Sequence, residues 1–388
     1  MRLTIAFFVD SVEFTPEVIA GTGSLGGSES AAIRVARAIA RRGHHVTVFS
    51  PGHGGGQWDG VTYLPIEQAV PYLQSTPHDV TIISRALELV PVQYASKLKV
   101  LWCHDLAMKR SRNAFGQGLW NLDAVYLLSA FQLAQYRTVH PGIPDSVYLQ
   151  TRNGIDLHEF PTHVARHPRK LVYGSRPERG LETALAVMTE LANRGSDFVL
   201  HVAGYDNPVP HLAQYVAELT AWAQRLPNVV MVGPLTQAAW HREIASARAM
   251  VYPGPPDHHG FAVFREISCL AAMEAMACGT PFVGVNKGAL AETLGDGGAI
   301  LLGDESTACS TREHAQAMAD AIESLRDDAT WDALHAACLM RAASLSWDDV
   351  ARDWERDWHW RLATQCGDPR RLAAHLKRTG ELEAMTPC

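Results

Sequence analysis

The sequence has little of what marks membrane or secreted proteins. Seven of its 388 residues are cysteine, and no two form a Cys-x-x-Cys pair. An odd number of scattered thiols is typical of a reducing compartment rather than of a disulfide framework. No apolar run reaches the ~18 residues that a membrane-spanning helix needs. No small-residue cleavage site follows the first apolar segment. These absences predict a cytoplasmic protein without a signal peptide.

Basic charge is also scarce. Lysine and arginine number 34 against 41 aspartates and glutamates, a net charge of −7. This balance argues against the broad basic surface of nucleic-acid-binding proteins, so no nucleic-acid partner is predicted. Two histidine pairs, His44-His45 and His258-His259, lack zinc-site spacing with the cysteines. We expect them to be solvated loop residues, and we predict no metal centre.

What the sequence does have is a regular alternation of short apolar runs and amphipathic stretches. This order predicts an α/β fold with a doubly wound parallel sheet in each half of the chain. The loop around 155–169, rich in His and Pro, separates a first domain, 1–160, from a second, 170–345. A Trp-rich helical stretch within about 347–388 is expected to return to the first domain. The predicted strands are 3–9, 45–49, 80–83, 98–102, 124–128, 147–149, 170–173, 198–202, 229–232, 249–252, 281–285 and 299–302; the predicted helices are 28–42, 181–192, 210–226, 238–246, 269–278 and 347–362.

A glycine-rich segment precedes the first predicted helix. Gly21, Gly23 and Gly26 match the G-x-G-x-x-G spacing of dinucleotide sites. They lie far beyond the first strand, however, and no acidic residue ends the second strand. Gly26 and Gly27, followed by a Ser28 cap, instead predict a helix N-terminus whose backbone amides can bind a phosphate. A plain capped turn is the alternative.

The strongest signal is a pair of carboxylates around a small-residue helix. Glu266 and Glu274 are separated by seven residues, and Cys-Gly-Thr-Pro ends the segment. A helix that starts near Cys269 places Glu266 ahead of it and Glu274 in its second turn. The backbone amides of Ser268, Cys269 and Leu270 then lie at a helix N-terminus, which suits a diphosphate. A surface helix with two solvated carboxylates is the simpler alternative, but it does not account for the alanine-rich face.

Two further segments follow predicted strands. Arg176 and Arg179 come after the first strand of the second half and open a helix, where guanidinium groups can neutralise a diphosphate. A solvated turn is the alternative. His104 and Asp105 end a strand of the first half, at the edge where open α/β sheets bind ligands.

Taken together in this order, the motifs resemble glycosyltransferase family 4, the retaining GT-B enzymes marked by E-x7-E. The resemblance covers about two-thirds of the chain, from Gly26 to Glu292. It includes Asn153 to Phe160, similar to the interdomain N-G-[IV]-D…F, and Gly288 to Glu292, similar to G-x-x-x-E. The sequence departs from the family in a shorter phosphate loop, where Arg179 replaces a lysine, and in Ser268-Cys269 after the first glutamate.

The resemblance implies two Rossmann-like domains facing across a cleft, with the acceptor site in the first and the donor site in the second. A nucleotide-diphosphate sugar would transfer its sugar to an acceptor hydroxyl of a glycan, a lipid-linked or a small molecule. His104, Glu266 and Arg179 are implied as catalytic residues. No Asp-x-Asp occurs in the chain, and the resemblance implies no metal and no other cofactor. The implied donor-binding residues are Gly26, Gly27, Arg176, Arg179, Gly204, Leu235, Ser268, Cys269, Leu270 and Glu274.

Several alternatives stay open at this stage. A sugar phosphorylase or a nucleotide-sugar epimerase can share the fold, and a dinucleotide-dependent oxidoreductase or a non-catalytic sugar-binding subunit is a more distant alternative. Arg34, Arg37 and Arg41 share one face of the first helix, with Arg42 adjacent, and such a face can dock on anionic lipid. A solvated face is the simpler interpretation. The sequence leaves the sugar, the base, the acceptor and the oligomeric state undetermined.

Overall fold

The chain forms two α/β units, each built on its own sheet. The computed structural model describes residues 2–10, 25–52, 55–107, 121–204, 210–258, 260–261 and 264–364. The first unit contains Leu25–Gly154, the N-terminal strand and the helix that begins at Trp347; the second contains Ile155–Ser346. Across the described ranges, no helix combines the length and the apolarity needed to cross a bilayer. Residues 21–24 of the glycine-rich segment and 365–388 of the C-terminal stretch lie outside these ranges.

The first unit is built on an eight-stranded sheet with the order β3-β4-β2-β1-β5-β6-β7-β8. All its pairings are parallel except that of β3 with β4. The parallel strands are apolar runs buried on both faces, as expected for strands covered by helices. The elements are β1 (Thr4–Val9), α1 (Gly27–Arg41), β2 (His45–Ser50), β3 (Gly56–Trp58), β4 (Val61–Pro65), η2 (Ile66–Gln68), α2 (Ala69–Ser75), β5 (His78–Ser84), η3 (Leu87–Leu89), β6 (Ser96–Cys103), β7 (Ala124–Leu127), α4 (Ala130–Val139), η6 (Asp145–Val147), β8 (Tyr148–Gln150) and α12 (Trp347–Thr364).

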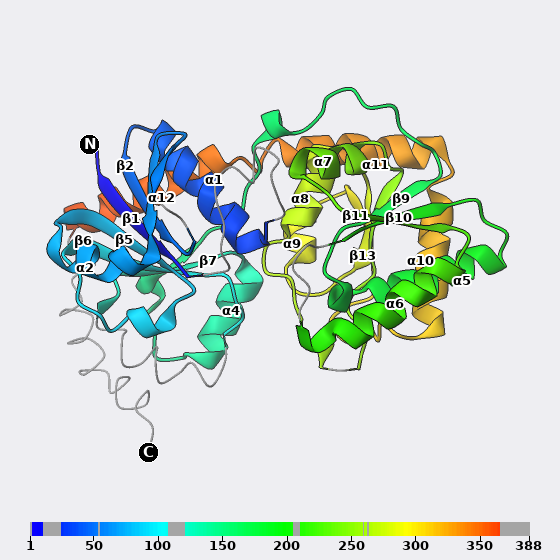
Figure 1. The fold of residues 1–388 in the computed structure, drawn as a ribbon, viewed down its shortest axis with the longest axis horizontal. Helices are drawn as coiled ribbons and strands as arrows, with labels where there is room; N and C mark the ends of the chain where they lie inside the picture. The colour runs from blue at the N-terminus through cyan, green and yellow to red at the C-terminus, as the bar shows by residue number, and fades with distance from the viewer. Residues whose placement is uncertain are drawn as a thin grey trace, which may run out of the picture. The chain divides into compact units, whose positions relative to one another are not determined.

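Helix α12 belongs to the first unit although it follows the whole second unit in sequence (Figure 1). It packs against α1 and β6. Trp354 is fully buried, makes edge contacts with the rings of Trp102 and Tyr126, and donates from Nε1 to the Thr151 hydroxyl at 2.8 Å. Tyr126 in turn donates to Asp357 at 2.6 Å. Three tryptophans of this helix, Trp347, Trp354 and Trp358, are therefore core residues, whereas Trp360 is exposed.

The arginines of α1 are used within the first unit. Arg41 pairs with Asp348 at 2.9 Å and Arg42 hydrogen-bonds Glu355 at 2.6 Å, both on α12. Arg37 pairs with Asp59 at 3.4 Å. Arg34 is 5% exposed and donates to Ser30. The expected solvated face is therefore wrong for the buried Arg34 and only partly met by the half-buried Arg37. Arg41 and Arg42 are exposed, and the return of α12 places carboxylates beside them. Membrane contact itself stays a prediction.

The second unit is built on a six-stranded parallel sheet with the order β11-β10-β9-β12-β13-β14. The order reverses between β9 and β12, which is where open α/β sheets bind ligands. The elements are η7 (Leu157–Glu159), β9 (Lys170–Tyr173), η8 (Pro177–Arg179), α5 (Leu181–Asn193), β10 (Val199–Gly204), η9 (Pro210–Leu212), α6 (Ala213–Arg225), β11 (Val229–Pro234), α7 (Gln237–Ala245), β12 (Ala249–Tyr252), α8 (Leu270–Ala277), β13 (Phe282–Val285), α9 (Leu290–Leu294), β14 (Ala299–Leu302), α10 (Arg312–Ser324) and α11 (Asp328–Ala342).

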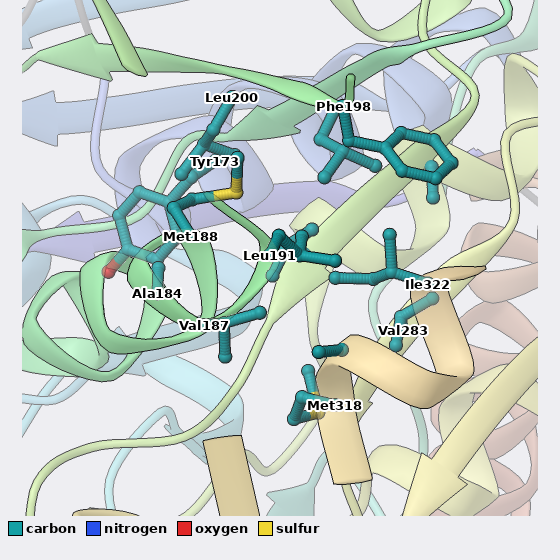
Figure 2. Close-up of a cluster of buried hydrophobic side chains, with 14 of the residues drawn as sticks. Tyr173, Ala184, Val187, Met188, Leu191, Phe198, Leu200, Val283, Met318 and Ile322 are labelled. Carbon is teal, nitrogen blue, oxygen red and sulfur yellow. The ribbon is translucent and has the colours of Figure 1, made fainter. Parts of the chain in front are cut away.

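Two apolar clusters, one on each face, hold this sheet between its helices. On one face, α5 and α10 supply Met188, Leu191, Met318 and Ile322, which pack with Phe198 and with strand residues of the sheet (Figure 2). On the other face, α7, α8 and α11 form the second cluster, in which the alanines of α8 are buried. The small side chains of α8 thus allow close packing beneath the carboxyl edge of the sheet.

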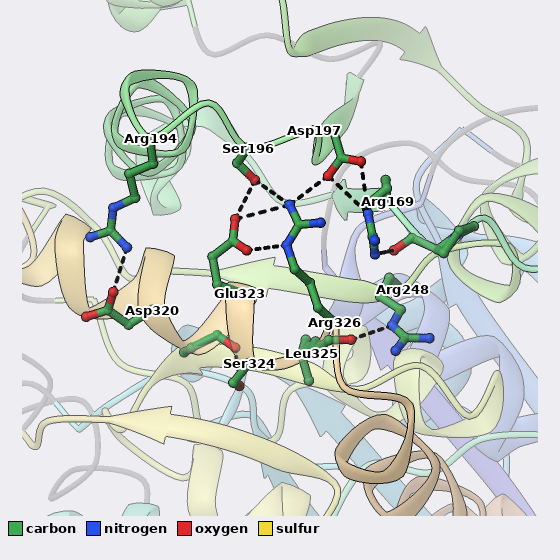
Figure 3. A network of polar contacts seen from close by, with 12 residues as sticks. Arg169, Arg194, Ser196, Asp197, Arg248, Asp320, Glu323, Ser324, Leu325 and Arg326 are labelled. Carbon is green, nitrogen blue, oxygen red and sulfur yellow. Dashed lines mark hydrogen bonds and ion pairs between the residues drawn. The ribbon is translucent and has the colours of Figure 1, made fainter.

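A polar network joins α5 and α10 at the surface of the second unit. Arg326 reaches Asp197 at 2.6 Å and also pairs with Glu323, while Arg194 of the α5 C-cap pairs with Asp320 at 2.5 Å (Figure 3). Exposed ion pairs contribute little to stability singly, so the apolar cluster below them provides most of the packing energy.

Candidate functional site

Glu266 is positioned by the carboxyl ends of two strands of the second unit. It lies in the segment before α8, where it forms an isolated parallel bridge with Gly288, the third residue after β13. The amide of Ala289 donates to the Glu266 carbonyl at 2.7 Å. The Glu266 carboxylate accepts a hydrogen bond from the hydroxyl of Tyr252, the last residue of β12. Backbone and side chain of Glu266 are therefore both fixed at the carboxyl edge of the sheet.

Gly288 is required for this arrangement. Its φ is +66°, and a Cβ at this position would meet the backbone oxygen and nitrogen of Glu266. Only glycine adopts such a conformation without strain. The Gly288 amide donates to Glu305, which also pairs with Arg265. The loops after β13 and β14 thus hold the Glu266 segment together.

Glu274 lies in the second turn of α8, as the spacing predicted. Its Oε2 accepts a hydrogen bond from Nε1 of Trp240, on α7, at 3.0 Å, and its side chain is 16% exposed. Gly174, which follows β9, leaves room for Trp240, because a Cβ there would meet the indole ring. Helix α8 begins at Leu270 with Cys269 as its N-cap. The amides of its first turn have no acceptors inside the helix, so they can bind an anion.

The loop that follows β9 and carries Arg176 and Arg179, here called the arginine loop, lies beside these residues. Arg179 ends η8, and its guanidinium stands over the Phe264 ring at 4.3 Å. Gly180, with φ +135°, leaves no space for a Cβ, which would meet the backbone of Gly254 after β12. The loops after β9 and β12 therefore touch at the switch point of the sheet. Arg176 forms an ion pair with Glu178 at 2.7 Å, so its charge is partly neutralised within the loop.

The charges of Arg179 and Glu266 both act on two buried groups, the Tyr252 hydroxyl and the Cys269 thiol. Burial raises the pKa of the Tyr252 hydroxyl well above its usual value; the Glu266 charge raises it further and Arg179 opposes this. Burial first, and the Glu266 charge second, raise the pKa of the Cys269 thiol in the same way. Tyr252 thus stays a hydrogen-bond donor to Glu266. A protonated, buried thiol makes Cys269 a poor nucleophile.

Gly204 and Leu235 lie at the ends of two neighbouring strands of the second unit. Gly204 ends β10 and is paired with Pro234 after a register shift in the β10–β11 ladder. A Cβ at Gly204 would press on the backbone of Gly233. Leu235 follows β11 directly and precedes Thr236, the N-cap of α7. Both residues therefore stand at the same edge as the arginine loop and Glu266.

In the first unit, the glycine turn contacts the end of β6 through one arginine. The N-cap of α1 is Gly26 and the helix begins at Gly27, without a side-chain cap. The expected Ser28 cap is therefore wrong: Ser28 lies inside the first turn, where it accepts from Arg85 at 3.3 Å. Arg85 also forms a bidentate pair with Asp105, at 2.8 and 3.1 Å. The Ser28 hydroxyl is thus available to Arg85 rather than to the helix amides.

His104 follows β6, at the carboxyl edge of the first sheet. Its ring lies 4.1 Å from the Trp102 ring, and its Nε2 is buried without a hydrogen-bond partner among the described residues. Burial, with a smaller effect of Arg85, lowers the pKa of His104 to about 3. The imidazole is therefore neutral near pH 7 and can exchange a hydrogen bond with an uncharged hydroxyl.

Of the two histidine pairs, His44 differs from the expectation of solvated loop residues because it is buried, whereas His45, in β2, and the loop residue His258 are exposed. His44 is 4% exposed; its Nδ1 accepts from the Leu3 amide at 3.1 Å and its Nε2 lies 3.3 Å from Glu355. His258 pairs with Glu182 at 2.7 Å, and His259 lies outside the described residues. Asp156, His158 and Glu159 place one potential metal-ligand atom each within 4.8 Å of one another. In this cluster Asp156 is buried, Glu159 half-buried and His158 exposed, and by itself the cluster assigns no metal centre.

Two side chains of the second unit were missed by the sequence reasoning. Tyr252 and Trp240 hold the two carboxylates, but in the sequence each is one aromatic residue at the end of a strand or within a helix. Only the folded sheet brings Tyr252 to Glu266 and Trp240 to Glu274.

Comparison with known proteins places these features in the second unit. Residues 168–328 match the family model described as glycosyl transferases group 1. Over 219 residues, the chain is 28% identical to glycogen synthase from Mycobacterium tuberculosis, covering 54% of this chain and 47% of that protein. The match thus spans about half the length of the curated relative.

Solved structures extend the likeness to both units. Sucrose-phosphate synthase from Thermosynechococcus elongatus superposes with a TM-score of 0.71 at 18% identity, covering 94% of this chain and 100% of that one. The catalytic domain of starch synthase IV from Arabidopsis thaliana, bound to ADP and acarbose, gives 0.70 at 14% identity, with coverages of 94% and 100%. HepE from Anabaena, in complex with UDP and glucose, gives 0.67 at 15% identity, with coverages of 92% and 99%. The chain therefore has the GT-B fold, and its residues 168–328 are similar to the group 1 glycosyl transferases.

Proposed function

We propose that the protein is a retaining, metal-independent glycosyltransferase that moves a hexosyl group from a nucleotide-diphosphate sugar to an acceptor hydroxyl. The observation that carries this proposal is the grouping of Glu266, Arg179 and the N-terminus of α8 at the switch point of the second sheet. The match of residues 168–328 to glycosyl transferases group 1 supports it. The acceptor would be a glycan, a lipid-linked or a small molecule.

Each residue has a role that its position supports. The amides of Ser268, Cys269 and Leu270 would hold the diphosphate together with Arg179, while Arg176, already paired with Glu178, would contribute less. Glu274 would accept hydrogen bonds from ribose hydroxyls and Glu266 from sugar hydroxyls. Gly204 and Leu235 would flank the nucleotide. In the first unit, Gly26 and Gly27 would bind the donor and the neutral His104 the sugar.

The chemistry would centre on the departing diphosphate. As the bond from the anomeric carbon to the phosphate oxygen breaks, negative charge grows on that oxygen and positive charge on the sugar ring. The acceptor oxygen then bonds to the anomeric carbon on the same face, and its proton passes to the leaving phosphate. Arg179 and the α8 amides would stabilise the leaving charge before it forms, which is the main electrostatic contribution such a site can make.

The proposal is tested by incubating the full chain with nucleotide sugars and measuring nucleoside diphosphate release, since slow hydrolysis needs no acceptor. UDP-glucose and ADP-glucose come first because the solved neighbours are described with UDP, glucose and ADP. We expect nucleoside diphosphate to be released without an added metal and equally in the presence of EDTA. Proton NMR is expected to show a product that keeps the donor's anomeric configuration. Inverted product would refute retention. An epimerised nucleotide sugar would indicate the epimerase alternative.

A cytoplasmic location and peripheral contact with a membrane stay predictions. Co-sedimentation with anionic liposomes at low and high salt tests the membrane contact, because an electrostatic attachment weakens as salt rises.

A further inference from the structure

The two oxygens of the Glu274 carboxylate have different environments. Oε2 accepts the hydrogen bond from Trp240, whereas Oε1 lies 4.0 Å from Nε2 of His241. Trp240 and His241 are adjacent on α7, so one turn of this helix faces both oxygens. His241 is 2% exposed, and its Nε2 is buried without a hydrogen-bond partner among the described residues. A buried nitrogen without a hydrogen-bond partner lowers the stability of the fold, and a histidine with a purely structural role does not need to lie beside a carboxylate in this way.

His241 is itself held by the segment that begins the second unit. Its Nδ1 lies 3.1 Å from the carbonyl oxygen of Glu159, and its ring stacks on Phe160 with centroids 4.2 Å apart. A carbonyl oxygen only accepts, so Nδ1 carries the hydrogen in this contact. Glu159 ends η7, a few residues after the boundary between the two units. The imidazole therefore connects the backbone of this segment to Glu274.

This geometry fixes the orientation of the Nε2 edge toward Glu274. Because Nδ1 is committed to Glu159, the ring cannot turn over to place another atom at Oε1 without losing that hydrogen bond and its stack on Phe160. The Glu274 carboxylate is then confined between Trp240 on one side and the His241 edge on the other. A carboxylate confined in this way loses little conformational entropy when a ligand binds.

We propose that His241 is a positioning residue for Glu274, which couples the Leu157–Phe160 segment to the part of the site that recognises the ribose of the nucleotide. This rests on the proposed function, in which Glu274 binds ribose hydroxyls. His241 acts through the carboxylate and does not touch the donor. Its effect is therefore specific to ligands that carry a ribose.

The test compares two probes that share a diphosphate and differ in the ribose. Calorimetry measures the affinities of UDP and ADP on one side and of inorganic pyrophosphate on the other. In His241→Asn, the amide keeps a donor toward Glu159 and removes the Nε2 edge. We expect the tighter-binding nucleotide to weaken about tenfold, the upper end of what ordering one released side chain on binding costs, while pyrophosphate is unchanged. His241→Gln, which restores a polar group near the Nε2 position, is expected to recover most of the loss.

Two controls separate positioning from folding. His201→Asn removes another histidine that contacts a glutamate of α7, Glu243, at 2.9 Å, and should leave both affinities unchanged. In a Glu274→Gln background, His241→Asn should have less than about a twofold effect, because coupled residues are not additive. If His241→Asn does not fold, His241→Phe keeps the stacked ring and deletes both nitrogens, with the same selective loss expected.

Equal weakening of nucleotide and pyrophosphate by the folded His241 variants would overturn the inference, and so would full additivity with Glu274→Gln. Failure of the proposed function looks different. In that case the wild-type chain binds neither UDP nor ADP and hydrolyses no nucleotide sugar, and the inference falls with it.

Discussion

Replacing Gly288 by alanine tests how firmly the fold holds Glu266. Gly288 has φ +66°, and a Cβ there would press on the backbone oxygen and nitrogen of Glu266, neither of which is the end of a flexible side chain. Gly195, at the end of α5, is the matched control. Its φ is +70°, and a Cβ there would meet nothing within 4 Å. The two substitutions thus share the backbone strain and differ in the steric push on Glu266.

The magnitudes follow from these two contributions. Placing alanine in the left-handed region is unfavourable by roughly 1–2 kcal/mol at either position. The overlap at Gly288 adds about 1–3 kcal/mol, as overpacking of a tight site does. For a unit of this size, 1 kcal/mol corresponds to roughly 2–4 °C in Tm. We therefore expect Gly288→Ala to melt about 2–12 °C below Gly195→Ala.

Scanning fluorimetry measures the melting, and nucleotide-sugar hydrolysis measures the effect on the site. Gly288→Ala should also lower kcat, since the shift displaces the backbone of Glu266, whereas Gly195→Ala should turn over like the wild type. Equal Tm values for the two variants, together with full turnover by Gly288→Ala, would refute the idea that this close approach positions Glu266.

Three more predictions follow from single side chains. Arg179→Ala should raise the barrier by about 2–4 kcal/mol, a fall in kcat of about 30- to 1,000-fold, while Arg176→Ala has a smaller effect because Glu178 already neutralises it; equal kinetics for both variants would contradict this assignment. Burial lowers the pKa of His104 from about 6.5 in the unfolded chain to about 3 in the folded protein, so between these pH values the unfolded chain binds more protons than the folded one and stability falls as pH falls. His104→Gln should therefore flatten the acid side of a Tm-against-pH curve in this window. An unchanged slope would contradict the burial argument. Leu191→Ala, fully buried between α5 and the sheet, should reduce the unfolding free energy by about 3–5 kcal/mol, measured by urea unfolding followed at the second unit, against a loss below about 0.5 kcal/mol for an exposed control such as Met340→Ala.

Much of the fold could be predicted because its signals are local. The buried strands of both sheets are short β-branched runs, and their periodicity does not depend on distant residues. Helix α4, Ala130–Val139, gave no comparable signal: its sequence lacks a clear apolar stripe, and its N-cap, Ser129, shows its role only through the bond from Gln132. Helices α10 and α11 lie in a polar stretch of the sequence. The buried face of α10 appears only where it packs on α5 and β13, and that of α11 only where it packs on α8.

The candidate site divides in the same way. The spacing of Glu266 and Glu274 around an alanine-rich helix, and the place of Arg179 after a strand, could be predicted because parallel strands bring their carboxyl ends to one edge. The partners of these residues could not. Trp240 is 34 residues away from Glu274 in sequence, and no local pattern links an indole to a carboxylate at that distance.

By itself, the sequence determined the class of fold, the two α/β halves and the helix that carries Glu274 with Glu266 ahead of it. These features depend on periodicity, on turn residues and on motif spacing, which act over a few residues. Tertiary structure alone decided that carboxylates of α12 pair with Arg41 and Arg42, that Gly288 lies against the backbone of Glu266, and that His241 lies between Glu159 and Glu274. Each of these contacts joins segments tens to hundreds of residues apart in sequence. Only the formation of the sheets and the packing of helices on them bring the partners together.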